Sequence, residues 1–476
     1  MNANKKLAVN SAIQIVGKVI MTIVGLVSVR LLTGYLGVDG FGGYVTITTF
    51  LIIASIVAEL GFNVVLTTEI SRQSQEEAER TISNIFTMRA VAAIAIIGVL
   101  SSAVVWLFPY DPQIKILVGL GSLGTIGFSL AQVLVGVFQK HLRTDKLTLG
   151  DLLARIVLMA GIVGLAMVDR ISLPAVIGFY TLSGIAHFFF IYWSAQKYYR
   201  FGLGFDFAYW KQVAWEAFPL FIIVAFNLVY YRIDTIMLSV MKDETAVGLY
   251  GAAYKVLEIL ITFPGMFVGL LLPVLAKYYW SNTDRFQAVF HQAFGMLASL
   301  AVPVVVGGII LSEGILSLVA GDAFTPATQA LQILFVGIGC IFLGTLVGQT
   351  LIAAKLQGRS MYISIVGAVF NVCLNLVLIP RFSYLGAAIS TAVTEALVLI
   401  TYIVVCGVFA KTWPRASVSL VWMAVATGAM AAAMLAIPDF NVLIRALVGA
   451  GVFGLVMLFA GPSRLRSWYK IDISEA

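Results

Sequence analysis

Charged residues within long apolar stretches are the residues of this sequence best suited to do chemistry. The basic ones are Lys18, Arg30, Arg232 and Lys255, and the acidic ones are Glu59, Asp234, Glu258 and Glu395. Each such charge costs about 2.5–3.5 kcal/mol if it faces lipid, so it should face a protein interior or a water-filled cavity. The cations suit an anionic group such as a phosphate, and the carboxylates suit a coupling H⁺ or Na⁺, or ion pairs with the cations.

A purely structural interpretation of these charges stays open. At about 1.5 Å per residue, Lys18 and Glu59 reach similar depths in their stretches and can meet. Likewise, Arg232 or Lys255 can meet Asp234 or Glu258. Ion pairing between helices and lining of a transport cavity are compatible, because one side chain can pair in one state and bind substrate in another. The near balance of positive and negative charges argues against a strongly cationic cavity.

Neutral polar residues give a weaker signal. Asn371 and Asn375 are spaced to share a helix face, as are Ser390 and Thr394 beside Glu395. Either group can bind sugar hydroxyls, although hydrogen bonding between helices is the commoner use of such residues. The sequence has no cluster of metal-binding carboxylates and no nucleotide-binding motif, so we expect no metal and no cofactor apart from a coupling ion.

The stretches that position these residues are membrane-spanning helices. Of the 476 residues, 61% are hydrophobic and 11% are charged, which excludes a sizeable soluble domain. A bilayer core needs about 20 apolar residues per helix. The expected spans are 9–33, 42–67, 85–108, 114–138, 152–168, 173–193, 215–240, 247–273, 292–311, 327–353, 361–379, 384–408, 417–437 and 441–461. The break between the first two spans depends only on the glycines between Gly34 and Gly43.

Basic residues predict the orientation. Most of the Lys and Arg residues outside the spans fall on the side that carries both termini, and positive residues are retained in the cytoplasm. We therefore expect a multi-pass protein of the inner (plasma) membrane with both termini cytoplasmic. Cytoplasmic loops next to anionic lipid headgroups account for the net charge of +7 without a nucleic-acid partner.

The chain also resembles itself at two places. Residues 29–44 (VRLLTGYLGVDGFGGY) and 232–250 both carry an Arg at the outer end of a helix, a turn, and then Gly-X-Tyr. This repeat predicts parallel halves, an arrangement that some transporters use to form a midplane cavity. The expected domains are an N-terminal six-helix bundle (1–194), a cytoplasmic interfacial linker (195–214), a second six-helix bundle (215–408), and two additional helices with a tail (409–476).

Residues 29–44, with 59–62 (ELGF) and 71–72 (SR), resemble the N-terminal signature of the polysaccharide-transport and O-antigen flippase branch of the multidrug/oligosaccharidyl-lipid/polysaccharide exporter superfamily. Residues 232–234 (RID), 247–254 (VGLYGAAY) and 272–273 (LP) resemble its second-half signature. The resemblance implies an alternating-access transporter of two six-helix bundles. The implied cargo is an isoprenoid-diphosphate-linked oligosaccharide, moved from the cytoplasmic to the outer leaflet. Membrane lipids and the polysaccharide assembly machinery are further expected partners.

Two other functions compete with this interpretation. A cation-coupled multidrug exporter of the same superfamily would share much of the fold, but the polysaccharide-branch signatures and the fourteen expected spans argue against it. A membrane glycan polymerase or ligase would be an enzyme. Such enzymes commonly carry a large outer loop, and the longest outer connection here, about residues 312–326, is short.

Overall fold

The computed structural model describes residues 3–59, 61–415 and 420–460. All regular elements within these residues are helical, which confirms the expected all-α class. By length and composition, 10 helices of the described chain can cross a membrane. The chain divides into two compact units, Met1–Gly248 and Leu249–Ala476, which are described in turn.

Two of the long helices contain a sharp internal break. In α1 (Ala3–Glu59) the break is at Gly37, with φ of 67°, within the glycine-rich segment where the sequence predicts it. In α14 (Gln357–Phe409) it is at Ser383, with φ of 52°, between the expected spans 361–379 and 384–408. The left-handed backbone at these positions turns the chain, so each of α1 and α14 is two helices. With these breaks counted, each expected span overlaps one helix or a run of consecutive helical segments of the described chain. Residues 417–419 and 461 of the last two expected spans lie outside the described residues.

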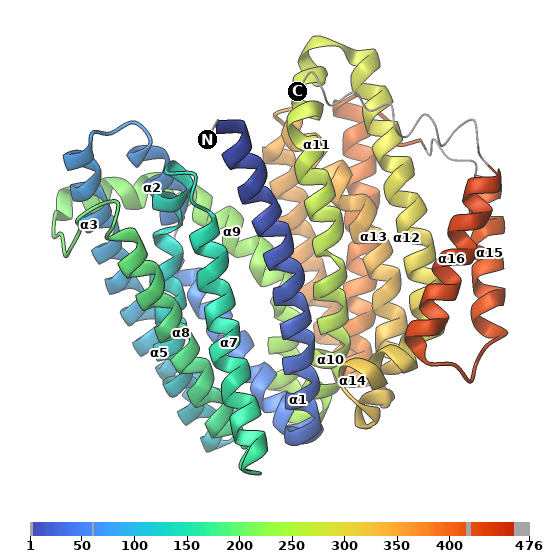
Figure 1. The fold of residues 1–476 in the computed structure, drawn as a ribbon, viewed down its shortest axis with the longest axis horizontal. Coiled ribbons are helices and arrows are strands. Elements are labelled where there is room, and N and C mark those ends of the chain that lie inside the picture. Colours follow the sequence, from blue (N-terminus) through green and yellow to red (C-terminus); the bar gives the residue numbers. More distant parts are fainter. Residues whose placement is uncertain (1–2, 60, 416–419, 461–476) are drawn as a thin grey trace. The chain divides into compact units, whose positions relative to one another are not determined.

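The N-terminal unit follows α1 with a series of helices that end at the start of α10. These are α2 (Phe62–Ile70), α3 (Gln75–Ala93), the π-helical segment η1 (Ile94–Leu100), α4 (Ser101–Val104), η2 (Val105–Leu107), α5 (Pro112–Val133), α6 (Val135–Lys140), α7 (Asp145–Met167), α8 (Leu173–Ala195), α9 (Phe207–Met241) and α10 (Glu244–Leu260). Figure 1 shows α5, α7 and α8 side by side, and α8 contacts both α5 and α7.

Local sequence fixes where these helices begin. A capping box starts α3, because the backbone N–H of Ser74 donates to the Glu77 carboxylate at 3.0 Å. The Asp111 carboxylate caps α5 by accepting from the backbone N–H of Gln113 at 2.7 Å, and Pro112 follows it at the first helical position. These caps satisfy backbone N–H groups that a helix leaves unpaired at its start.

Small residues allow close packing between helices. In the α5–α8 contact, the backbones of Gly124 and Gly184 approach so closely that a Cβ on either glycine would collide with the backbone of the other helix. The Thr181 hydroxyl on α8 donates to the carbonyl oxygen of Leu120 on α5 at 3.0 Å. Without a hydrophobic force between helices in lipid, such close contacts supply the packing energy.

The two segments that resemble each other in sequence also meet. A Cβ on Gly42 would collide with the carbonyl oxygen of Glu244, and one on Gly248 with the carbonyl oxygen of Val38. Nearby, the Thr245 hydroxyl donates to the Asp39 carboxylate. The glycines of the repeated Gly-X-Tyr motif therefore serve the close crossing of α1 and the start of α10.

The C-terminal unit continues from α10 to the last described helix. Its further elements are α11 (Thr262–Ser281), α12 (Thr283–Val319), η3 (Asp322–Ala327), α13 (Thr328–Ala353), α14, α15 (Leu420–Leu435) and α16 (Val442–Ala460). The last two pack on each other and on α12, where Leu311, Met430 and Met434 form a buried cluster. The expected division at residues 195–214 stays a prediction.

Candidate functional site

Two of the four expected cations lie on α1 without an ion-pair partner. Lys18 and Arg30 are both exposed, and neither forms an ion pair with any residue whose side chain the structure describes. They are twelve residues apart, so they differ in depth by about 18 Å along the helix. At about 100° per residue they point in clearly different directions. Two free cations are therefore presented at two levels of one helix.

A third cation, Arg155, joins them from α7. Its guanidinium approaches the backbone of α1 so closely that a Cβ on Gly25 would lie 2.9 Å from Nη1. About two turns nearer the N-terminus of α1, in the same contact between α1 and α7, Gly17 packs against Thr148. Lys18 follows Gly17 directly and lies beside this contact between α1 and α7, whereas Arg30 lies on a different face of α1. Arg155 is exposed and likewise has no ion pair among the described side chains.

Lys18 and Glu59, which the sequence allows to meet, do not form an ion pair in this structure. Glu59, at the end of α1, lies close enough to the Arg89 guanidinium to interact with it electrostatically. Arg89 on α3 is only 2% exposed. Its Nε donates to the carbonyl oxygen of Ser129 on α5 at 3.3 Å, and its Nη1 is buried without a hydrogen-bond partner among the described residues. Depth counting alone missed Arg89, which lies on a helix that follows Glu59 in the sequence.

Of the other expected pairs, one forms within a single helix. Lys255 Nζ lies 2.8 Å from Glu258 Oε2, three residues further along α10, rather than bridging two helices. Both side chains stay partly exposed, so the pair contributes little to stability. Asp234 on α9 is buried and Arg232 half-buried, and both are engaged in further interactions within the protein.

Both halves of α14 carry buried polar residues, here together called the seam, namely Asn371, Asn375, Ser390 and Thr394. Gly386 packs against the carbonyl oxygen of Leu378 beside the break, and the hydroxyls of Ser360 and Tyr402 lie 3.1 Å apart at the far end. These two contacts fix an antiparallel register between the halves. In this register Asn375 lies within about one helical turn of the level of Ser390, and Asn371 within about one turn of the level of Thr394.

All members of this seam are buried, and Glu395 adjoins it. Asn375 Nδ2 donates to Asn371 Oδ1 at 3.0 Å. The hydroxyls of Ser390 and Thr394 are fully buried, without a hydrogen-bond partner in the described chain. Because an unpaired buried hydroxyl costs about 1–3 kcal/mol, the two orphan hydroxyls mark the seam as a candidate ligand site. Contact of its amides with sugar stays a prediction.

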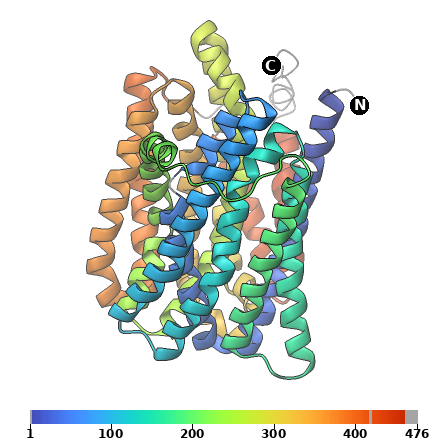
Figure 2. The ribbon, with the colours of Figure 1, turned by 90° about the vertical axis from the view of Figure 1, so that its left-hand side faces the viewer.

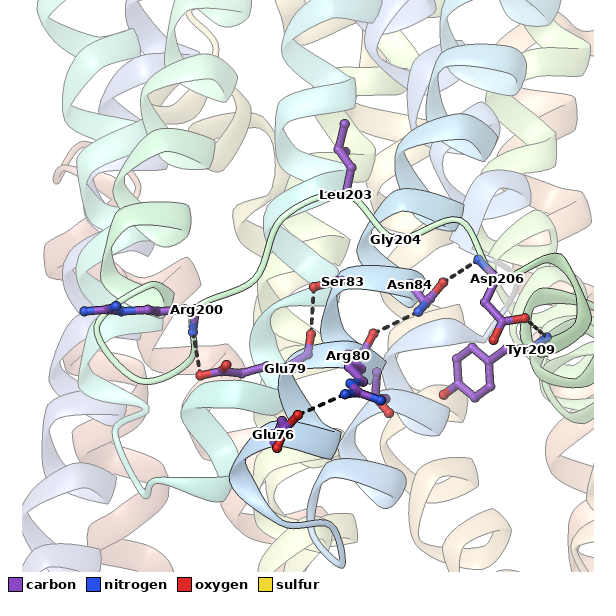
Figure 3. Close-up of a pocket in the computed structure, with 11 residues that line it drawn as sticks. Glu76, Glu79, Arg80, Ser83, Asn84, Arg200, Leu203, Gly204, Asp206 and Tyr209 are labelled. Carbon is purple, nitrogen blue, oxygen red and sulfur yellow. Dashed lines mark hydrogen bonds and ion pairs between the residues drawn. The ribbon is translucent and has the colours of Figure 1, made fainter.

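A polar pocket of about 530 Å³ lies between α3 and the linker that leads into α9. The pocket is lined by Glu76, Glu79, Arg80 and Asn84 of α3 and by residues of the linker. Figure 3 shows Glu79 accepting from the backbone N–H of Arg200 and Asn84 accepting from that of Asp206. Tyr209 closes one end, and its hydroxyl donates to the Glu69 carboxylate. Burial and then this carboxylate raise the pKa of Tyr209, so the phenol stays protonated at physiological pH.

Sequence reasoning missed Arg89 and Arg155 because both lie within about four residues of the start of their expected spans and were counted with the cytoplasmic loops. The structure begins α3 at Gln75 and α7 at Asp145, several turns before each arginine. For α3 the capping signal at Ser74 and Glu77 was present in the sequence and marks the true start of the helix. Counted from that start, Arg89 lies about 21 Å into α3.

The chain matches two models of known protein families. The family model described as polysaccharide biosynthesis protein matches residues 7–279, and the MatE model matches residues 219–377. The chain is 27% identical over 243 residues to a probable flippase AglR of Haloferax volcanii, covering 48% of this chain and 50% of that protein. It is 25% identical to the capsular polysaccharide biosynthesis protein CapF of Staphylococcus aureus, covering 44% and 54%. The chain thus matches about half the length of these curated relatives.

Solved structures share the fold. The lipid II flippase MurJ in an inward closed conformation superposes with a TM-score of 0.77 at 16% identity, covering 94% of this chain and 98% of that one. An inward-facing multidrug resistance MATE family transporter superposes with a TM-score of 0.68 at 12% identity, covering 81% and 93%. Since the family model matches more than half of the chain, this protein belongs to the polysaccharide biosynthesis protein family and has the fold shared by MurJ and MATE transporters.

Proposed function

We propose that the protein is a flippase for lipid-linked glycans. Its cargo is an isoprenoid-diphosphate-linked oligosaccharide, such as an O-antigen, capsule or exopolysaccharide repeat unit. The protein transfers no glycan itself but carries the headgroup by alternating access from the cytoplasmic to the outer leaflet of the inner membrane. The charge asymmetry of the loops, with both termini assigned to the cytoplasm, supports this direction.

The observation that carries this proposal is the set of unpaired cations on α1 and α7. Lys18, Arg155 and Arg30 stand at different depths in apolar helices, and none has an ion pair among the described side chains. A diphosphate with a polar glycan cannot cross about 30 Å of hydrocarbon unaided. Cations at successive depths give its phosphates successive charge-assisted contacts while the isoprenoid tail stays in the lipid. Arg232 and Lys255 are the corresponding candidates of the second half.

The buried seam of α14 supports coupling to a cation. Its amide and hydroxyl oxygens, with the Glu395 carboxylate beside them, are hard oxygen donors of the kind that hold Na⁺ in transporters. We assign this coupling role to Na⁺ at Asn371, Asn375, Ser390 and Thr394, with Glu395 supplying the negative charge. Sodium bound there would satisfy the two orphan hydroxyls.

A multidrug exporter is the second candidate, because the MatE model and MATE structures match this chain. The unpaired cations argue against it. A cationic drug passing Lys18 and Arg155 would meet like charge, which costs binding energy rather than supplying it. Anionic cargo is favoured at the same residues.

The test is flipping by cation variants in reconstituted vesicles. Removing a phosphate-binding cation by Lys18→Ala or Arg155→Ala costs about 1.5–3 kcal/mol, so flipping of a fluorescent isoprenoid-diphosphate oligosaccharide should slow about 10- to 100-fold. Lys115→Ala is the matched control, since Lys115 lies over the Trp106 ring and outside the cation set, and should flip at the parent rate. Parent rates in both test variants would overturn the role of these cations.

A further inference from the structure

The linker between α8 and α9 is fixed along α3 by a regular series of hydrogen bonds. Backbone N–H groups of Arg200, Gly202 and Gly204 donate to Glu79, Ser83 and Thr87 at 2.9, 3.2 and 2.9 Å. The acceptors are four residues apart on one face of α3, and the donors two residues apart on the linker. Four helical residues advance about 6.0 Å and two extended residues about 6.6 Å, so the spacings match.

Two further contacts extend this series at its ends. The Gln75 side chain donates to the carbonyl oxygen of Tyr198 at 2.9 Å, and the backbone N–H of Asp206 donates to Asn84 at 2.8 Å. Figure 2 shows the linker, in green, crossing the blue α3 on its way from α8 to α9. Residues 197–206, here called the strap, therefore have a defined conformation despite lacking regular secondary structure.

The apolar side chains of this segment fall into a buried group and an exposed group. Tyr199 and Phe201 are buried in the core beneath it. Leu203, Phe205 and Phe207 are instead 69%, 62% and 70% exposed. Figure 3 shows the Leu203 side chain pointing away from α3 and the pocket. Three adjacent large apolar side chains held out from a rigid backbone mark an interaction surface rather than scattered exposure.

The position of the strap along α3 indicates that membrane lipid covers these side chains. The exposed residues Glu76 and Arg80 make the surface of the first turns of α3 charged. The residues that reach its surface after Thr87 are apolar, namely Met88, Ala90 and Val91. The strap begins at the charged level and reaches Thr87, so its exposed side chains lie where α3 changes from polar to apolar. The indole rings of Trp193 on α8 and Trp215 on α9 are also exposed on either side of the strap in sequence. Aromatic residues of this kind collect at the boundary between headgroups and hydrocarbon.

Exposed basic residues indicate that this lipid is acidic. Lys197, Arg200 and Lys211 are exposed within or directly after the strap. Of the carboxylates nearby, Glu76 pairs with Arg80 at 2.9 Å, Glu79 accepts from the backbone N–H of Arg200, and Asp206 caps α9 through the backbone N–H of Tyr209. Each exposed cation at a membrane surface contributes about 1 kcal/mol of attraction to acidic lipid.

We propose that the strap and the first turns of α9 form an acidic-phospholipid docking surface, in which Leu203, Phe205 and Phe207 enter the headgroup boundary while Lys197, Arg200 and Lys211 hold acidic headgroups. The ladder of hydrogen bonds on α3 presets this surface. Docking ties the N-terminal unit to one leaflet at a fixed depth.

The depth of this surface in the membrane is tested by fluorescence quenching in nanodiscs of phosphatidylcholine and phosphatidylglycerol. With the 3 cysteines replaced by alanine, bimane is attached to Phe205→Cys or, as the aqueous control, to Glu76→Cys. We expect lipid carrying a doxyl group near the headgroup to quench bimane at 205 but not at 76, and aqueous iodide to do the reverse. Equal quenching by iodide at both positions would overturn the proposal. Leu203→Cys is the alternative site if Phe205→Cys does not give monodisperse protein.

The lipid preference is tested with the same probe at 205. Doxyl-labelled phosphatidylglycerol should quench it more strongly than equally labelled phosphatidylcholine, with an apparent preference of at least about fivefold. The triple variant Lys197→Gln, Arg200→Gln, Lys211→Gln should abolish that preference and keep the depth. Equal quenching by the two lipids in the parent protein would show that the surface has no preference for acidic headgroups and would contradict the proposal.

Discussion

Arg89 is held in the N-terminal unit at an energetic disadvantage. Its guanidinium is buried, donates to one backbone carbonyl group, and has Glu59 near it rather than in direct contact. Taking a charge out of water costs several kcal/mol unless close partners compensate for it. Residues that reduce stability in this way are commonly retained for function.

This imbalance predicts an asymmetry between two substitutions. Glu59→Gln removes the nearest carboxylate from a buried cation, so it should lower stability by about 1–3 kcal/mol. Arg89→Met removes the costly charge and keeps most of the volume, so it should be neutral or stabilising. The double variant should be more stable than Glu59→Gln alone. Thermal melts in detergent measure all three, and an Arg89→Met protein less stable than Glu59→Gln would contradict this account.

The α14 seam predicts a sodium response. At constant ionic strength, replacing choline by Na⁺ should raise the melting temperature, because a ligand at 100 times its Kd adds about 2.7 kcal/mol of stability. Thr394→Val should lose this response. Thr427→Val is the matched control, since Thr427 on α15 also has a buried hydroxyl without a hydrogen-bond partner in the described chain. An unchanged sodium response in Thr394→Val, or none in the parent protein, would argue against the site.

Residue types alone predicted part of these sites. Lys18 and Arg30 stand out because a cation within an apolar stretch needs an explanation wherever it points. Arg89 and Arg155 escaped notice because each lies near the start of its apolar window, and apolar windows do not show that the helix begins several turns earlier with polar residues. The choice of Arg89 rather than Lys18 as the neighbour of Glu59 depends on which helices pack together, which the local sequence does not encode.

Among the elements, the α5–α8 contact provides a test on a single helix. A methyl group on Gly184 would collide with the backbone of Gly124, so Gly184→Ala should cost about 1–3 kcal/mol by overpacking. Gly178, on the same helix, has no other group within 4 Å of where its Cβ would be. Gly178→Ala should therefore stabilise the protein by about 0.5–1 kcal/mol through helix propensity. Equal melting temperatures for the two variants would contradict this close approach of α5 and α8.

The breaks in α1 and α14 show what element-level reasoning can achieve. The glycines near Gly37 are residues that tolerate a left-handed backbone, so they predict the first turn. The strap on α3 was not predicted, because the acceptors at Glu79, Ser83 and Thr87 look like the ordinary polar face of a helix end. Only the position of the linker shows that its backbone donates to them.

At the scale of the whole molecule, the family match and the fold agree. The polysaccharide biosynthesis model covers the segments in which the sequence resembles polysaccharide transporters, and the MurJ fold extends over 94% of the chain. The repeated glycine motifs, recognised first by their spacing, pack closely in the N-terminal unit at Gly42 and Gly248. Composition and periodicity predicted the membrane spans because the bilayer imposes one length and one polarity on each.

The most direct test of the flippase assignment is the movement of cargo by the purified wild-type protein. Vesicles are prepared with a fluorescent isoprenoid-diphosphate oligosaccharide in both leaflets, and a membrane-impermeant reductant then bleaches the outer label. We predict nearly complete bleaching in vesicles that contain the protein, unaffected by excess cationic drug, and bleaching of only the outer-leaflet fraction in protein-free vesicles. The same plateau with and without protein would contradict the account.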